Sequence, residues 1–176
     1  MDKGKVEVCG LADKFLIGQV YGDNCSVNEF LKTIEKSPSG IITSDNILYT
    51  LWDKILFVSS LNPIGALLNL TFCEISASPN LSELVKNIIA ETIPIINSQN
   101  IKFDLEQTLA SILRKATGAG YHECSMSQDV KNHKRTEIDY LNGGIALLGK
   151  KLGFSTPIND TLTLLIKAKE ASYLET

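Results

Sequence analysis

The spacing of apolar residues changes near residue 44, and this change constrains the fold more than any other feature of the chain. Beyond that residue, apolar side chains recur every three or four positions, so each set falls on one face of a helix. Five or six packed helices are therefore expected in this part of the chain. The sets are Leu81, Leu84, Val85, Ile88 and Ile89; Leu105, Leu109, Ile112 and Leu113; Ile138, Leu141, Ile145, Leu148 and Leu152; and Ile158, Leu162, Leu165 and Ile166.

Residues that commonly begin helices support the same interpretation. Asn80 with Glu83, and Asp104 with Gln107, have the spacing of a capping pair, in which the first side chain accepts from the backbone of the new helix. Pro157 stands where the first turn of a helix tolerates proline, because the N–H that proline lacks has no helical partner there. We expect helices to begin near these three places.

The apolar stretch from residue 54 to 72 approaches the ~20 residues that a helix needs to cross a bilayer. It also contains Asn62 and Pro63 at its centre and Asn69 near its end, which make an isolated membrane span costly. We therefore expect no membrane span, but two buried core helices that are broken at Pro63. By the same argument, Pro94 should kink the helix that contains it.

The amino-terminal part has short, strand-like signals instead. Residues 6–10 and 15–22 are bounded by glycine or charged residues, and Ile41 and Ile42 form another short apolar run. An amphipathic helix is expected at 27–35. Too few strands are present to close a stable sheet, so this part looks like the end of a larger α/β unit.

The fold class that follows is mainly α, with a small α/β remnant at the amino terminus. We place the remnant, a hairpin with one helix and a short strand, at residues 1–43 and a helical domain at residues 44–176. With 176 residues, 44% of them apolar and 21% charged, the chain has the composition of a globular protein. A chain of this size buries roughly two-thirds of its unfolded surface, so a real core is expected.

Composition also excludes several classes of function. A net charge of −3 leaves no basic field to neutralise phosphates, so nucleic acid is not expected as a partner. Cys9, Cys25, Cys73 and Cys124 form no CxxC pair, which indicates buried free thiols rather than a zinc or dithiol site. The polar amino terminus lacks an apolar signal region, so we expect a cytoplasmic protein.

Neither a dinucleotide-binding motif nor a metal-ligand pattern is found. No GxGxxG segment follows a predicted strand; Gly118 and Gly120 come nearest, but they follow a helix and indicate its end. His122 and His133 lie in connecting segments at a spacing that matches no helical ligand pair, so no metal site is expected. No residue is therefore assigned to cofactor binding.

Lys54 stands at the start of an otherwise apolar helix, and Asn62 lies eight residues further on. A lysine drawn into the start of a core helix loses hydration, which suits it to proton transfer. Alternatively, its ammonium group extends to solvent while its stem covers apolar surface. The pattern alone leaves both interpretations open.

Ser125 and Glu137 form a second polar cluster. They are twelve residues apart, so on one straight helix they would lie ~18 Å apart along the axis and about 120° around it. Both can reach one site only if the chain breaks between them. Thr136 can restart a helix as its cap, with Glu137 in the first turn, where the helix dipole stabilises its charge. A solvated helix cap explains the same residues equally simply.

Four separated motifs carry a resemblance to a known family. They are Trp52-x-Lys54 followed by Asn62-Pro63; Ser125-Met126-x-Gln128-Asp129; Thr136-Glu137-Ile138-Asp139-Tyr140-Leu141-Asn142-Gly143; and Gly153 with Thr156-Pro157-x-Asn159. In order and spacing, residues 44–172 resemble the carboxy-terminal domain of the ketopantoate reductases, or 2-dehydropantoate 2-reductases. The preceding stretch is similar to the last hairpin and helix of the family's Rossmann domain, most clearly at Ile17 and Gly18.

The resemblance implies a helical domain of the 6-phosphogluconate dehydrogenase C-terminal-like fold, which binds substrate and dimerises. In that family, NADPH reduces the ketone of 2-dehydropantoate to pantoate, in pantothenate and coenzyme A synthesis. Lys54 would then supply the proton that the developing alkoxide needs, and Glu137 would hold that lysine or the substrate hydroxyl. Ser125 would bind the substrate carboxylate, and Asn62 would help to orient the substrate.

Three positions depart from the family pattern. Val58 stands four residues after Lys54, where the family usually has asparagine, and Phe72 replaces a further family asparagine. Both changes remove polar contacts, so substrate binding is expected to be weakened or altered. Asn100 replaces a glycine at a helix end, which is a milder change because asparagine tolerates the left-handed conformation.

Two functions remain open. In the first, the chain is part of an NADPH-dependent oxidoreductase for ketopantoate or another 2-keto acid, and a nucleotide-binding half is supplied in cis or in trans. Without that half, it is expected to be inactive and to bind NADPH poorly. In the second, the chain is a non-catalytic helical module that dimerises or binds a partner. Open strand edges and apolar faces predict a homo-oligomer in either case.

Overall fold

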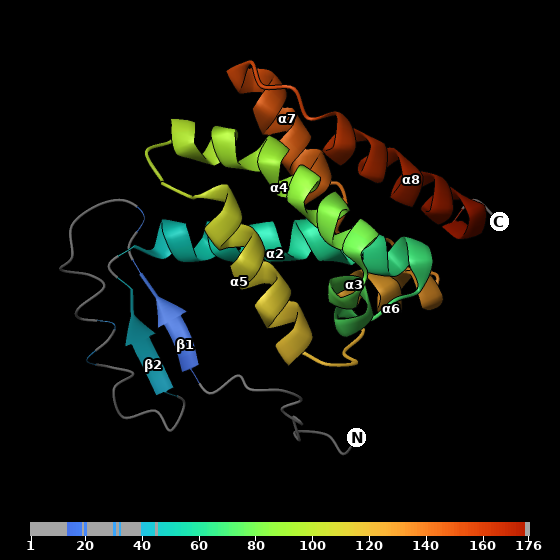
Figure 1. Cartoon of the computed structure of the whole chain (residues 1–176), viewed down its shortest axis with the longest axis horizontal. Coiled ribbons are helices and arrows are strands. Elements are labelled where there is room, and N and C mark those ends of the chain that lie inside the picture. Colours follow the sequence, from blue (N-terminus) through green and yellow to red (C-terminus); the bar gives the residue numbers. More distant parts are fainter. Residues whose placement is uncertain are drawn as a thin grey trace. The chain divides into compact units, whose positions relative to one another are not determined.

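The chain forms two compact units, Met1–Leu51 and Trp52–Thr176, and each is described by itself. Figure 1 shows the computed structural model, coloured along the sequence. The structure describes residues 14–18, 20, 30, 32, 40–44 and 46–174.

The first unit contains a parallel pair of strands. Strand β1, Lys14–Ile17, pairs with β2, Gly40–Thr43, in a register that places Lys14 opposite Gly40. Parallel strands need a crossover of a dozen or more residues, which agrees with a helix between them. Phe30 and Lys32 are helical, but the rest of the predicted helix at 27–35 and the predicted strand at 6–10 lie outside the described residues.

The strand predicted at 15–22 ends at Ile17, earlier than expected. The Ile17 carbonyl accepts from the backbone N–H of Ser44 at 2.8 Å. At Gly18 the chain passes so close to its neighbours that a Cβ would lie 2.4 Å from Ile47 Cβ and 2.7 Å from the Ser44 oxygen. Only glycine fits such an approach at the end of the strand.

The second unit is built from helices, and the first of them, α2, begins in the first unit. The described residues contain seven helices from α2 onward, against the five or six predicted, because α3 and α6 are short. Their bounds are α2 Ile47–Leu68, α3 Phe72–Ala77, α4 Pro79–Ser98, α5 Leu105–Gly118, α6 Ser125–Lys131, α7 Asn142–Leu152 and α8 Pro157–Leu174.

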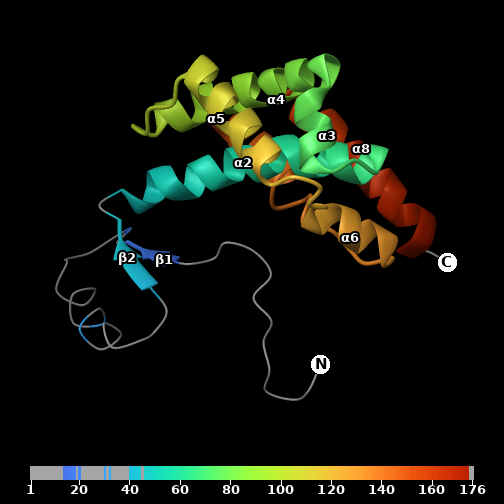
Figure 2. The same ribbon diagram turned by 60° about the horizontal axis from the view of Figure 1, so that its bottom comes forward.

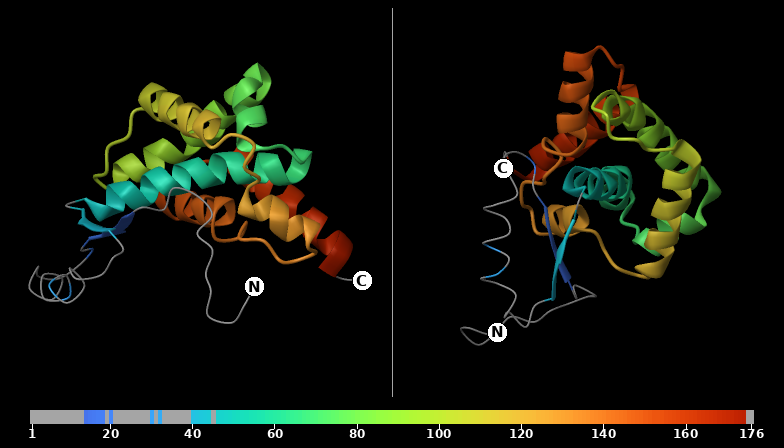
Figure 3. Two further views of the ribbon diagram at one scale, coloured as in Figure 1. Left: turned by 90° about the horizontal axis from the view of Figure 1, so that it is seen from below. Right: turned by 90° about the vertical axis from the view of Figure 1, so that its left-hand side faces the viewer.

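Helix α2 runs through the middle of the helical unit, with the other helices around it (Figure 3, right). The predicted apolar faces supply most of the core, but two of their members are exposed: Leu152, at 37%, and Leu165, at 48%. The largest fully buried side chains are Leu56, Leu61, Ile64, Ile75, Ile88, Ile89, Ile95, Ile96, Ile112, Met126, Ile138 and Ile166. No helix in the described part of the chain has the length and apolar character that a membrane span requires.

Helices begin near all three predicted places, although the cap of one of them is a different residue. The Asp104 carboxylate accepts from the Gln107 backbone N–H at 2.9 Å, and Pro157 is the first residue of α8. Helix α4 begins near Asn80, at Pro79, but its cap is Ser78 instead of Asn80. Serine is as good a cap as asparagine, and proline favours the first helical position.

The predicted break at Pro63 is wrong, because α2 continues through it to Leu68. Proline cannot donate to the carbonyl four residues earlier, here that of Ser59. The Asn142 side chain donates to this carbonyl at 3.0 Å and so replaces the missing helical bond. The chain instead leaves α2 through Asn69, whose φ is 57°. Asn100 is likewise left-handed, with φ 63°, at the end of α4.

Candidate functional site

Three polar side chains from separate segments meet at one point of the helical unit. Asn62 comes from α2, Ser125 is the first residue of α6, and Glu137 lies in the turn before α7. Ser125 Oγ donates to Glu137 Oε1 at 2.8 Å, and Asn62 Nδ2 donates to the same oxygen at 3.3 Å. Asn62 Nδ2 also lies 3.5 Å from Ser125 Oγ. Helix α6 therefore ends between Ser125 and Glu137, which allows both side chains to reach one site.

The hydroxyl of Ser125 is free to face Glu137 because another residue caps α6. Cys124 Sγ accepts from the backbone N–H of Ser127 at 3.3 Å, in the position where a serine or aspartate usually stands. The same thiol donates to the backbone oxygen of Asn62 at 3.5 Å. Gly65 makes room for it, since a Cβ there would lie 3.1 Å from the sulfur. Cys124 thus ties α6 to α2 beside the site.

Glu137 lies in a turn, so the predicted helix restart at Thr136 is wrong. Thr136 Oγ1 accepts from the backbone N–H of Ile138 at 3.3 Å, only two residues away. Such a local bond competes with helix formation, and α7 begins only at Asn142. The carbonyl of Glu137 accepts from Tyr140 N at 3.0 Å, which closes the turn.

The hydrogen bonds among the three residues use their donors and leave some of their acceptor atoms unpaired. The Ser125 proton is directed to Glu137, and the Asn62 amide N–H groups point to the same cluster. Asn62 is 2% exposed, and its Oδ1 has no hydrogen-bond partner among the described residues. Buried polar atoms are usually satisfied. The cluster is therefore suited to a group that donates, such as a hydroxyl or an ammonium.

Lys54 does not contact this cluster directly. It is exposed on α2, eight residues before Asn62, which corresponds to ~12 Å along the helix axis. Among the described residues it has no hydrogen-bond or ion-pair partner. The neighbouring carboxylate of Asp53 is taken by Lys115 of α5, at 2.6 Å. The structure therefore brings together Asn62, Ser125 and Glu137, and leaves Lys54 exposed at the surface.

The two departures that remove an asparagine, Val58 and Phe72, have different surroundings. Val58 is half-buried on α2, four residues before Asn62. Phe72 is 7% exposed and packs edge-on against Phe57, with ring centroids 5.3 Å apart. The His122 ring lies 6.1 Å from it. Phe72 is thus part of the core, whereas Val58 is partly exposed on α2.

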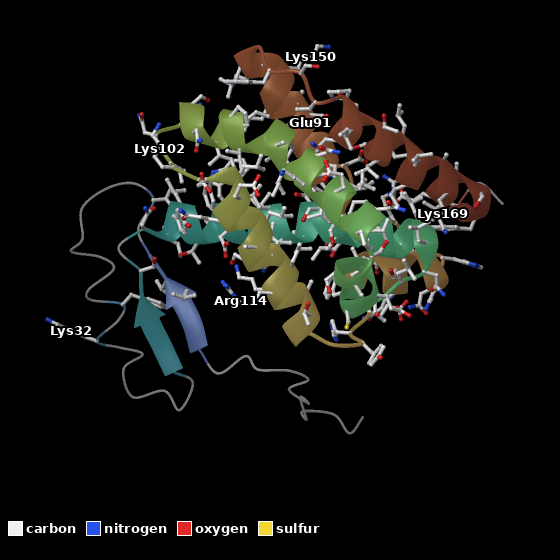
Figure 4. The ribbon with its side chains drawn as sticks, in the orientation of Figure 1. Lys32, Glu91, Lys102, Arg114, Lys150 and Lys169 are labelled. Carbon is white, nitrogen blue, oxygen red and sulfur yellow. The ribbon has the colours of Figure 1, made fainter. Side chains whose placement is uncertain are left out.

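A buried polar network near Pro63 was missed from the sequence. Glu91 of α4, labelled in Figure 4, accepts from the backbone N–H groups of Ile158 at 2.8 Å and Asn159 at 3.1 Å. The Asn159 side chain also donates to Glu91, at 2.8 Å, and accepts from Asn142, at 3.0 Å. The Asn142 amide then reaches the Ser59 carbonyl of α2. The sequence signal that could have indicated this network is an asparagine in the first turn of each of two helices, Asn142 in α7 and Asn159 in α8.

The remaining candidate ligands do not assemble into a metal site in the described residues, where no group of three suitable side chains occurs. His133 instead stacks on Tyr173, with ring centroids 5.2 Å apart. Cys73 and Cys124 are free thiols, and Cys9 and Cys25 lie outside the described residues.

The sequence is similar to that of a known family. Residues 46–170 match the family model described as "Ketopantoate reductase PanE/ApbA C terminal". The chain is 34% identical over 175 residues to a 2-dehydropantoate 2-reductase of Aquifex aeolicus, covering 95% of this chain and 56% of the relative. A 2-dehydropantoate 2-reductase of Pyrococcus horikoshii is 33% identical over 152 residues, covering 85% and 50%. The chain thus spans about half the length of these curated relatives.

Solved structures are similar as well. D-mandelate dehydrogenase in complex with NADH and anilino(oxo)acetate matches with a TM-score of 0.83 and 28% identity, covering 92% of this chain and 68% of that one. A dimeric ketopantoate reductase from Staphylococcus aureus matches with a TM-score of 0.76 and 22% identity, covering 92% and 55%. At that identity the second match shows the fold alone.

Proposed function

Because the chain belongs to the ketopantoate reductase family, we propose that it is the substrate-holding, helical part of an oxidoreductase that reduces a 2-keto acid. The observation that carries this proposal is the meeting of Asn62, Ser125 and Glu137. These side chains come from positions up to 75 residues apart in the sequence, and their hydrogen bonds are 2.8–3.5 Å long. A cap in solvent would need no such convergence.

Each residue has a chemical part in this proposal. Reduction of a ketone places negative charge on its oxygen, which must receive a proton. Lys54 supplies that proton, because an ammonium both stabilises the charge and donates. Glu137, whose Oε1 accepts from Ser125 and Asn62, holds the ammonium or the substrate hydroxyl with its other carboxylate oxygen. Asn62 orients the substrate, and its buried Oδ1, unpaired among the described residues, needs a small rotation of the amide to accept from it.

Ser125 requires a rearrangement to bind the substrate carboxylate. A hydroxyl has a single proton, and that of Ser125 is directed to Glu137 at 2.8 Å. To donate to a carboxylate, Ser125 must rotate its O–H away, and an ammonium arriving at Glu137 would replace the lost hydrogen bond. Arrival of Lys54 and binding of the carboxylate are therefore coupled in this proposal.

The family implies a nicotinamide cofactor, but the residues of this chain do not fit its binding site. The sequence contains no GxGxxG segment to cradle a pyrophosphate. We therefore assign none of its residues to the nucleotide. Hydride would come from NADPH on a nucleotide-binding half in cis or in trans, and this chain handles the ketone and its proton.

Ketopantoate is the first substrate to test, because the curated relatives named above are 2-dehydropantoate 2-reductases. A 2-keto acid with an aromatic side chain is the second. D-mandelate dehydrogenase matches this chain at 28% identity, and the partly exposed Val58 of α2 is apolar where the family usually has asparagine. An apolar wall favours an apolar substrate side chain over a polar one.

A non-catalytic helical module remains the alternative, and one observation favours it. Lys54 lacks a partner among the described residues, and the apolar Val58 stands between it and Asn62. In that case the chain would dimerise or bind a partner without turnover.

The deciding experiment supplies the missing half. The amino-terminal half of the Aquifex aeolicus relative, fused or mixed with this chain, should give NADPH oxidation with ketopantoate or phenylglyoxylate. Lys54→Ala should remove it, whereas Lys102→Ala, which changes an exposed lysine between α4 and α5, should not. A folded assembly with no turnover on either keto acid would overturn the proposal and favour the non-catalytic module.

A further inference from the structure

We infer that Glu170 of α8 is a positioning residue that holds the turn carrying Glu137 against Asn62 and Ser125. The inference rests on the proposed function, because it concerns the same substrate site. It is carried by the contacts that α8 makes on both sides of Glu137.

Glu170 makes a buried contact with the backbone just before Glu137. Its side chain is 6% exposed, and Oε1 accepts from the backbone N–H of Thr136 at 2.5 Å. Thr136 is itself 7% exposed, so water has little access to this N–H. A buried carboxylate is costly unless it is hydrogen-bonded, and a buried backbone N–H needs an acceptor. Each group therefore satisfies the other and fixes the chain one residue before Glu137.

Two further side chains of α8 hold the same turn. Tyr173 Oη donates to the backbone oxygen of Lys134 at 2.9 Å, and its ring stacks on His133 at an interplanar angle of 17°. Lys167 forms an ion pair with Asp139 Oδ1 at 2.8 Å. These contacts lie three residues before Glu137 and two residues after it.

The three side chains belong to one face of α8. Lys167, Glu170 and Tyr173 follow one another at three-residue spacing, which places them along the same side of a helix. Figures 2 and 3 show the carboxy-terminal end of α8 beside α6, the helix that begins with Ser125. One helix face therefore holds the turn next to the site.

The turn cannot place Glu137 by its own bonds. The hydrogen bonds from Tyr140 N and Leu141 N to the Glu137 carbonyl, 3.0 and 3.1 Å long, set the shape of the turn but not its distance from Asn62. That distance is held by contacts outside the turn, among them burial of Ile138 in the core and the hydrogen bond of Thr136 to Glu170 of α8. In enzymes, a displacement of ~1 Å at a reacting group costs on the order of 100-fold in rate. A residue that fixes the position of Glu137 can therefore affect activity without contacting the substrate.

The test is made in the full chain. It separates the effect of side-chain length at position 170 from the effect of its negative charge. Glu170→Gln keeps an oxygen at the same distance and should still accept from Thr136. Glu170→Asp keeps the charge but withdraws it by one methylene and should lose the contact. The readout is the pair of side-chain amide resonances of Asn62 in nitrogen-15 NMR spectra, which Glu137→Ala identifies. Leu162→Ala, which changes a buried core residue of α8, controls for general loss of stability.

We expect the Asn62 resonances to move toward their Glu137→Ala positions in Glu170→Asp and to stay in place in Glu170→Gln and Leu162→Ala. Movement in Glu170→Gln without movement in Glu170→Asp would show that charge matters and would overturn the inference. Equal movement in Leu162→Ala would overturn it too, because any loosening of α8 would then suffice.

Binding of pantoate distinguishes this inference from the proposed function. Glu170→Asp should weaken pantoate binding roughly tenfold, while Glu170→Gln should stay within about twofold. If Glu137→Ala leaves pantoate binding unchanged, the proposed function fails, and the Asn62 resonances alone decide the role of Glu170. If Glu137→Ala abolishes binding while Glu170→Asp changes neither readout, only the positioning role is refuted.

Discussion

Removal of the Glu91 carboxylate should destabilise the helical unit more than any surface change on the same helix. Glu91 accepts three N–H groups at the start of α8, two from the backbone and one from the Asn159 side chain, at 2.8–3.1 Å. Asn159 is fully buried, so water cannot take over from the carboxylate.

The magnitude follows from these contacts. A hydrogen bond to a charged group contributes about 1.5–3 kcal/mol net, and bonds that share one acceptor are not additive. We therefore expect Glu91→Ala to lower the free energy of unfolding by about 3–5 kcal/mol. Glu91→Gln keeps one accepting oxygen and should cost roughly half as much. Against a total stability of typically 5–15 kcal/mol, the alanine variant is close to unfolding.

The assay is urea unfolding at 25 °C, followed by circular dichroism and by the fluorescence of Trp52, the single tryptophan. Glu83→Ala is the matched control, because Glu83 is exposed on the same helix. Surface substitutions usually change the free energy of unfolding by no more than about 0.5 kcal/mol. If the unfolding free energies of Glu91→Ala and Glu83→Ala differ by less than that, the predicted role of Glu91 is refuted.

Three other predictions follow from the same structure. Cys124→Ala should cost about 1 kcal/mol in urea unfolding, because α6 loses its cap, while Cys124→Ser should cost less. Burial, and then the negative charges of Glu170 and Asp129, raise the pKa of Tyr173 above its ordinary value of 10.0. Its stabilisation is therefore present below pH 10 and lost as the pH rises further, so the stability difference between wild type and Tyr173→Phe should shrink in alkaline urea titrations. The edges of the β1–β2 pair and the 72% exposed Leu147 predict self-association, and a clean monomer by light scattering at high concentration would contradict it.

Local patterns in the sequence predicted most of the helical fold. Apolar spacing identified the buried faces of α4 and α5, because those faces repeat within a few residues. Asp104 and Pro157 marked helix starts correctly, since caps and first turns depend on neighbours three positions away. The resemblance to a family then named Asn62, Ser125 and Glu137, which no local pattern could bring together.

Predictions failed where a distant partner overrides a local rule. Pro63 should break a helix, but Asn142, 83 residues after Ser59, restores the missing hydrogen bond. Thr136 looked like a cap, yet its hydroxyl bonds within the turn. Glu170 contacts Thr136 across 34 residues, and a single sequence contains no signal for that pairing. The structure is therefore needed to identify polar contacts between residues that are far apart in the sequence.

The bond between Asn142 and the Ser59 carbonyl also has a consequence for the order of folding. A ribosome would have to deliver 83 further residues before the partner of that carbonyl existed. Until then, α2 contains a proline with an unsatisfied carbonyl, so the nascent helix should fray on either side of it. The middle of the fold is thus completed late, by a contact of high sequence separation, which slows folding. A chain that stops short of α7 should therefore be bound by chaperones or degraded, even though most of its helices have already been synthesised.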